Sequence, residues 1–149
     1  MIRPSIADTG IIVALLDRTD AWHEWTVSEM RGLQLPFSTC EAVVTEACFL
    51  VAHLPEGKQK VLQLVSRGIF QIDFSLSDEI RAVERLMKKY ADLPIDLADA
   101  CLVRMSELNE KAIVFTLDSD FQVYRRRGKQ TIPLLPPPET LKRGQKRKR

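Results

Sequence analysis

The sequence contains no long hydrophobic run, and this absence argues against a membrane-spanning helix. No apolar stretch reaches the roughly 18 residues that a bilayer crossing requires. The N-terminal segment MIRPSIADTGIIVALLD is apolar, but Asp8 interrupts it and no small-residue cleavage site follows. We therefore expect a cytoplasmic protein without a signal peptide and without a membrane partner.

Cysteine and histidine are also scarce. The three cysteines, Cys40, Cys48 and Cys101, form no C-x-x-C pair, which favours reduced thiols in a core over a disulfide framework or a zinc site. The two histidines, His23 and His53, lie far apart beside apolar helical positions, so we expect structural or surface roles. No G-x-S-x-G motif, Gly-rich phosphate loop or Walker lysine is present, which disfavours a covalent nucleophile and nucleotide-driven phosphoryl transfer.

Charge is distributed unevenly along the 149 residues, whose formal net charge is +2. The last eight residues, KRGQKRKR, hold six of the 22 basic residues, so the rest of the chain has 16 basic and 20 acidic residues. Such a tail favours a polyanion such as nucleic acid, or it is simply a solvated end. The length suits one domain. We expect a folded domain over residues 1–136 and a flexible basic tail over residues 137–149.

Short apolar runs alternate with helical patterns, which predicts an α/β fold with a mainly parallel sheet. The predicted strands are Ser5–Asp8, Leu35–Ser38, Ile69–Phe74, Ala112–Thr116 and Thr131–Leu135. The predicted helices are Ile11–Leu16, Asp20–Met30, Cys40–Leu54, Lys58–Ser66, Asp78–Tyr90 and Asp96–Leu108, with a short helical turn near Phe121. Asp20, Thr39 and Ser77 are the expected residues at the starts of three of these helices.

Carboxylates fall at positions where a sheet of this kind binds ligands. Asp8 and Asp118 follow two of the predicted strands, and ligands bind outside the carboxyl ends of parallel strands. Glu46 interrupts an apolar helix, where a charge is costly unless it is paired or bound to a metal. Asp96 and Asp99 are three residues apart and therefore share a helix face.

Each of these acids also has an ordinary structural explanation. Asp118 suits a turn, Asp96 suits a helix N-cap, Asp99 suits a helix start, and Glu46 could pair with a buried base. The combination, with no His or Cys cluster beside it, predicts a site for a hard divalent cation, Mg²⁺ or Mn²⁺.

Four motifs in order resemble the PIN-domain family. They are ADTG (Ala7–Gly10), TEACFLV (Thr45–Val51), PIDLADACLV (Pro94–Val103) and FTLDSDFQVYR (Phe115–Arg125). The chain looks most like the VapC-type toxins of toxin–antitoxin pairs and related proteins with a DLADA segment. The resemblance covers about Ile2 to Leu135 and implies a three-layer fold, with four or five short parallel strands flanked by helices.

The resemblance also implies the roles of individual residues. The core acids of the family fall on Asp8, Glu46, Asp99 and Asp118, which would be catalytic and metal-binding. Asp96 and Asp120 match auxiliary acidic positions, and Thr9 and Thr116 match hydroxyl positions that often lie beside the acids. The implied activity is a ribonuclease that hydrolyses RNA phosphodiester bonds with Mg²⁺ or Mn²⁺, the ion activating a water and offsetting phosphate charge.

Basic residues near the acids are the candidate RNA contacts, with a solvated charged face as the alternative. They are Arg104, Arg125, Arg126 and Arg127. The expected partners are RNA, a second copy of the chain in a homodimer, and an antitoxin protein. The alternative function is a non-catalytic PIN-fold protein that binds RNA or serves as a scaffold. A small-molecule phosphatase is disfavoured because no D-x-D-x-[TV] motif is present.

Overall fold

A five-stranded parallel sheet forms the centre of the protein in the computed structural model, which describes residues 3–136. The order is β3-β2-β1-β4-β7, and each neighbouring pair of strands is parallel. The strands are β1 (Ser5–Ala7), β2 (Phe37–Thr39), β3 (Phe70–Ile72), β4 (Ile113–Phe115) and β7 (Leu134–Leu135). The predicted α/β class and parallel sheet are therefore confirmed.

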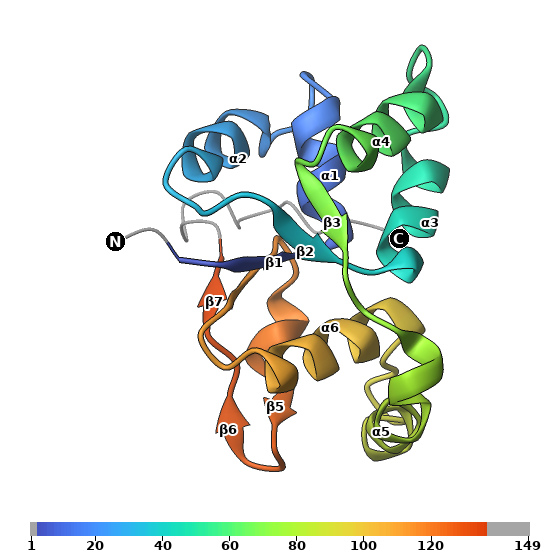
Figure 1. Cartoon of the computed structure of the whole chain (residues 1–149), viewed down its shortest axis with the longest axis vertical. Coiled ribbons are helices and arrows are strands. Elements are labelled where there is room, and N and C mark those ends of the chain that lie inside the picture. The colour runs from blue at the N-terminus through green and yellow to red at the C-terminus, as the bar shows by residue number, and fades with distance from the viewer. Residues whose placement is uncertain (1–2, 137–149) are drawn as a thin grey trace.

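Six α-helices flank this sheet within residues 3–136. They are α1 (Thr9–Leu16), α2 (His23–Met30), α3 (Glu41–Leu50), α4 (Gly57–Ser66), α5 (Leu76–Lys89) and α6 (Leu97–Leu108). Figure 1 shows α1 to α4 on one side of the sheet and α5 with α6 on the other, which gives three layers. None of the helices in this range has both the length and the apolar character that a bilayer crossing demands.

The core forms where the short strands bury both faces. All three residues of β1 and of β4 are buried, as expected for central strands covered by helices on either side. Phe37 packs against Phe70 and Phe115, with ring centroids 5.4 and 6.4 Å apart, so aromatic contacts run across three strands. Cys40 and Cys101 lie in this core as free thiols.

The predicted helix Cys40–Leu54 is wrong at its C-terminal end, because α3 stops at Leu50. The chain then turns back on itself, and Pro55 cannot continue the helical hydrogen bonds. A Cβ added at Gly57 would lie 2.0 Å from the carbonyl oxygen of Val51, so only glycine permits this close approach. The turn sets α4 against α3.

The expected start residues were wrong for three helices. Thr39 does not cap α3; its Oγ1 donates to the carbonyl oxygen of Ala7 at 3.1 Å and ties β2 to β1. Asp20 accepts from the amide of Trp22 in a turn that precedes α2. Ser75, rather than Ser77, caps α5 by accepting from the amide of Asp78. Of these three helices, only α5 has a side-chain cap, since the N-cap residues Trp22 of α2 and Cys40 of α3 form no such hydrogen bond.

The C-terminal part contains a small antiparallel sheet that the sequence did not predict. It pairs β5 (Arg125–Arg126) with β6 (Gln130–Thr131), so Thr131 belongs to this hairpin and not to β7. The turn needs left-handed backbone at Arg127 (φ 51°) and Gly128 (φ 85°). A short 3₁₀-helix, η1 (Ser119–Gln122), precedes β5. The predicted basic tail, residues 137–149, lies outside the described residues.

Candidate active site

Three aspartates from distant parts of the chain converge at the carboxyl edge of the sheet. Carboxylate oxygens of Asp8, Asp99 and Asp118 all lie within 4.8 Å of one another. Asp8 and Asp99 are buried, and Asp118 is half-buried. Like charges this close are unfavourable together unless a cation, a proton or hydrogen-bond donors compensate them.

The register of the central strands explains why Asp8 and Asp118 meet. Strands β1 and β4 are parallel, and Ala7 pairs with Phe115. Asp8 directly follows β1 and its amide donates to the carbonyl of Phe115 at 3.1 Å. Asp118 follows β4 by three residues. Both acids therefore leave the sheet at the same edge, as the sequence predicted from the strand ends.

Two threonines contact Asp8, but only Thr116 does so through the hydroxyl that the resemblance implied. The Thr9 amide donates to Asp8 Oδ1 at 2.7 Å, and Thr116 Oγ1 donates to Asp8 Oδ2 at 2.7 Å. Thr116 Oγ1 in turn accepts from the amide of Asp118 at 2.9 Å. One hydroxyl thus connects two acids of the cluster. The Thr9 hydroxyl is buried without a hydrogen-bond partner among residues 3–136, so only its backbone supports Asp8.

Asp99 is positioned by the start of α6 and by a tyrosine. Asp96 is the N-cap, and its Oδ1 accepts from the Asp99 amide at 2.8 Å. Tyr124 Oη donates to Asp99 Oδ2 at 3.2 Å. Burial, followed by the negative charges of Asp99, Asp120 and Asp118, raises the pKa of Tyr124 well above its usual value, so the phenol stays protonated and donates.

Sequence reasoning missed Tyr124. It stands in the quoted motif FQVYR, but its spacing from Asp99 carries no periodic signal, because the two residues come from different elements. The apolar residues beside it in the sequence, Phe121 and Val123, were the only sign that Tyr124 is buried. Phe121 and Tyr90 pack against it with centroids 5.3 and 5.2 Å away, which buries the ring and aims the hydroxyl inward.

Glu46 lies outside the group of three, although the resemblance placed it with them. Its side chain projects from α3, and the carboxylate oxygen Oε1 is buried with no hydrogen-bond partner among residues 3–136. A buried carboxylate oxygen in this state is costly, and a cation is the natural compensation. This buried, unpartnered oxygen makes Glu46 a candidate metal ligand.

The auxiliary acids take ordinary structural positions. Asp96 caps α6, which is the alternative that its sequence context left open. Asp118 caps η1, where its Oδ1 accepts from the amide of Asp120 at 2.9 Å. Asp120 itself is exposed. The carboxylate of Asp118 therefore serves the cluster and the following turn at once.

The predicted RNA contact Arg104 is held by two carboxylates. Its Nε lies 2.7 Å from Glu79 Oε1 on α5, and its Nη1 lies 3.1 Å from Glu107 Oε1. Burial lowers the pKa of the guanidinium, but the hydrogen bonds and charges of Glu79 and Glu107 together outweigh it, so the pKa of Arg104 is raised. Arg104 fastens α6 to α5 in this structure.

The three consecutive arginines are also committed to internal contacts. Arg125 Nη1 donates to the carbonyls of residues 122–124 at 2.7 to 3.1 Å. Arg126 is 9% exposed, and its Nη1 donates to the carbonyl of Ser106 at 2.8 Å. Arg127 donates to the Glu107 carbonyl and forms an ion pair with Glu110. Arg126 and Arg127 fasten the hairpin to the C-terminal end of α6, where cations are favourable, whereas Arg125 stabilises the turn that precedes β5.

The acidic cluster fits a hard divalent cation. Asp8, Asp99 and Asp118 offer only oxygen ligands, and the orphaned Glu46 Oε1 adds a further candidate. Carboxylate oxygens with room for water suit Mg²⁺ or Mn²⁺. The cluster is compatible with a metal site, and Asp8, Asp99 and Asp118 would hold the ion.

Comparison with known proteins agrees with this geometry. The model of the PIN domain matches residues 6–127 of the chain. No curated protein matches it. The matched range runs from β1 to the turn of the small hairpin and includes all three clustered aspartates. PIN domains are generally nucleases, so the match indicates a nuclease-type function. The chain belongs to the PIN-domain family.

Proposed function

We propose that this protein is a metal-dependent endoribonuclease that hydrolyses RNA phosphodiester bonds with Mg²⁺ or Mn²⁺. The observation that carries the proposal is the convergence of Asp8, Asp99 and Asp118 within 4.8 Å at the carboxyl edge of the sheet. When bound, the divalent ion supplies an activated water and offsets negative charge on the phosphate. The metal dependence and the RNA substrate are proposals, supported by the oxygen donor set and the resemblance.

The residues of the chain orient the acids for this chemistry. Thr116 aims Asp8 through Oδ2 and at the same time accepts from the amide of Asp118. Tyr124, which follows Asp99 in the sequence, donates its hydroxyl to Asp99 Oδ2. Donors fixed in a packed core keep the carboxylates in one arrangement and lower the cost of reorganisation during reaction.

The cellular role that we propose is the toxin of a type II toxin–antitoxin pair in the cytoplasm. It rests on the likeness to VapC-type proteins, and a short antitoxin gene directly upstream would support it. We also propose a homodimer. Phe49 on α3 is 76% exposed and Leu62 on α4 is 56% exposed, which supports a contact through these helices. A mass near that of one chain in light scattering would contradict the dimer.

The test of the nuclease proposal compares two aspartates three residues apart. Asp99→Asn keeps the side-chain shape and removes a clustered charge, so cleavage of RNA in Mg²⁺ should be abolished while thermal stability stays the same or rises. Asp96→Asn should have a small effect, because asparagine is an equally good N-cap.

The outcomes separate the alternatives. Cleavage by Asp99→Asn at the wild-type rate would show that the assigned site is wrong. Wild-type protein that binds RNA and cleaves none in Mg²⁺ or Mn²⁺ would favour the non-catalytic binding or scaffold role.

A further inference from the structure

Helix α5 carries a row of exposed cations that the proposed active site does not use. Arg81, Arg85 and Lys88 are spaced i, i+4 and i+7, so they share one face of the helix; we call these three residues the α5 stripe. Within residues 3–136, none of the three forms an ion pair shorter than 4.0 Å. The exposed acids on the same helix are Asp78 and Glu84, so positive charge predominates.

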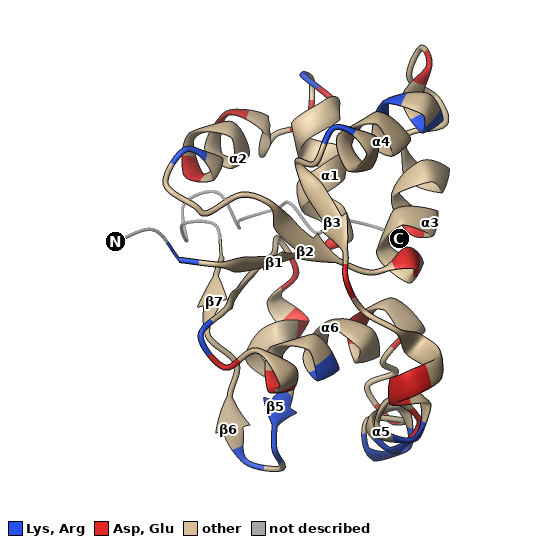
Figure 2. Ribbon diagram, viewed as in Figure 1, with Lys and Arg blue, Asp and Glu red and all other residues tan. Residues whose placement is uncertain are grey.

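The basic surface continues beyond the helix. Lys89 Nζ donates to the carbonyl of Gly128 at 3.1 Å, which brings the turn of the β5–β6 hairpin against the end of α5. Lys129 in that turn is exposed. Figure 2 shows basic residues along α5 and at the turn of the hairpin. The arginines that sequence reasoning chose, in contrast, are held by carbonyls and carboxylates.

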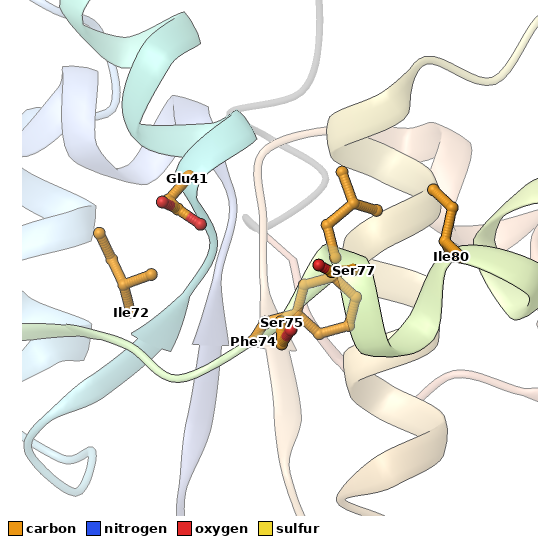
Figure 3. Close-up of a pocket in the computed structure, with 7 residues that line it drawn as sticks. Glu41, Ile72, Phe74, Ser75, Ser77 and Ile80 are labelled. Carbon is orange, nitrogen blue, oxygen red and sulfur yellow. The ribbon is translucent and has the colours of Figure 1, made fainter.

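A pocket of about 670 Å³ lies at the N-terminal end of the stripe. Figure 3 shows Glu41 and Ile72 on one side of it and Ser77 and Ile80 of α5 on the other. Ile72 and Ile80 are 37% and 48% exposed. Ser77 is four residues before Arg81, so the pocket and the stripe share a helix face. The lining combines apolar surface with hydroxyl and carboxylate acceptors.

The pocket is also close to the acids. It lies at the carboxyl ends of β2 and β3, which is the same edge of the parallel sheet from which Asp8 leaves β1. Ile6 pairs with Ser38, which sets Asp8 level with Cys40 and one residue before Glu41. Neighbouring strands are about 4.8 Å apart, so the pocket begins one or two strand spacings from the acidic cluster.

We propose that the pocket and the α5 stripe bind a single-stranded RNA next to the site of cleavage, with an unstacked base in the pocket and phosphates on the stripe. The proposal rests on the nuclease function above and names the surface that holds its substrate. Surfaces for single strands combine a row of cations with side chains on which bases stack, usually aromatic ones. Phe74 is the aromatic residue in the pocket lining, beside Ile72 and Ile80. Glu41 would repel a phosphate and can accept from the amino or imino edge of a base.

Binding of uncleaved RNA tests the stripe. The probe is a labelled single-stranded RNA of about 12 nucleotides, within the usual footprint of such surfaces, titrated by fluorescence anisotropy in EDTA. The variant Arg81→Gln/Arg85→Gln/Lys88→Gln is compared with Lys58→Gln/Lys60→Gln/Arg67→Gln, which removes the same charge from α4 and the residue after it. Every protein is the full chain, so the basic tail contributes equally to all of them.

The stripe variant should bind RNA at least tenfold more weakly at low salt. Its slope of log affinity against log salt should be shallower by about 2, because each neutralised phosphate of a single strand contributes about 0.7. The α4 variant should keep the wild-type slope. All six positions are exposed, so thermal unfolding should stay unchanged for both variants.

A second pair tests the pocket. Ile80→Asp places a negative charge where the base would lie and should weaken RNA binding. Leu35→Asp alters an apolar residue of similar exposure, 53% against 48%, that lies before β2 at the opposite edge of the sheet, and it should not weaken binding. Equal binding by the stripe variant and the α4 variant, or by the two Asp variants, overturns this inference. Because the assay needs no metal, a chain that binds RNA through the stripe but cleaves none would contradict the nuclease proposal alone.

Discussion

The acidic cluster (Asp8, Asp99 and Asp118) and the arginine cluster (Arg126 and Arg127) differ in how their charges are compensated. Asp8, Asp99 and Asp118 gather like charges within 4.8 Å, whereas Arg126 and Arg127 meet carbonyls and a carboxylate at the end of α6. Placing like charges together lowers the free energy of unfolding, whereas pairing a charge with hydrogen-bond partners or an opposite charge offsets that cost. The contrast indicates that the first region is kept for function and the second for holding the fold together.

After the complete loss expected for Asp99→Asn, the next largest effect should come from Glu46, which extends the acidic cluster only if it serves the same ion. Glu46→Gln should lower RNA cleavage about a thousandfold, roughly 4 kcal/mol of transition-state stabilisation, since the amide cannot supply the charge. Calorimetric titration with Mn²⁺ should show weaker binding. The matched control is Glu24→Gln on α2, an exposed acid whose change should leave both quantities unaltered.

Wild-type cleavage and Mn²⁺ affinity in Glu46→Gln would restrict the site to the three aspartates. In that case the buried Oε1 destabilises the fold without serving the site, and replacing the charged carboxylate should raise the free energy of unfolding.

Arg126 should show the opposite behaviour. Arg126→Met keeps most of the side-chain volume but withdraws the donors from the carbonyls of Ser106 and Glu110. We expect the free energy of unfolding in urea to fall by about 2 kcal/mol, because buried acceptors lose their partners. RNA cleavage at a temperature where the variant is folded should stay within twofold of wild type, a range of about 0.4 kcal/mol. A selective loss of activity would instead make Arg126 part of the RNA site.

The two clusters also differ in how far the sequence predicts them. Asp8 and Asp118 follow short buried strands, and parallel strands bring such positions to one edge, so their convergence follows from pattern and topology. The partners of Arg104 and Arg126 depend on how α6 meets α5 and the hairpin. No periodicity encodes contacts between elements, so the predicted RNA contacts rested on charge alone.

The same reasoning explains the boundaries that were missed. The start of α5 is decided by one hydrogen bond from the Asp78 amide to Ser75, and Ser77 offered an equally plausible cap in the sequence. The end of α3 depends on the close approach of Gly57 to Val51, which is a tertiary contact. The β5–β6 hairpin has two-residue strands, too short for alternation to be visible. Local pattern therefore predicted the sheet and the acids better than the caps and turns.

The smallest expected effect distinguishes the acidic cluster from the arginine cluster through two tyrosines that pack against each other. Tyr124 and Tyr90 pack with ring centroids 5.2 Å apart, but Tyr124 Oη donates to Asp99 whereas Tyr90 Oη accepts from the Arg125 amide at 2.8 Å. Tyr124→Phe should lower the Mn²⁺ affinity and RNA cleavage about tenfold, since a group that orients a metal ligand contributes of this order. Tyr90→Phe removes the same atom and should lower only the free energy of unfolding, by about 1 kcal/mol, because the Arg125 amide loses its acceptor. Calorimetry with Mn²⁺ and urea unfolding on both variants give the comparison. If both variants lose stability alike and neither loses Mn²⁺ affinity, Tyr124 belongs with the structural contacts of the arginine cluster, and the acidic cluster is oriented by Thr116 and the Thr9 and Asp99 backbone alone.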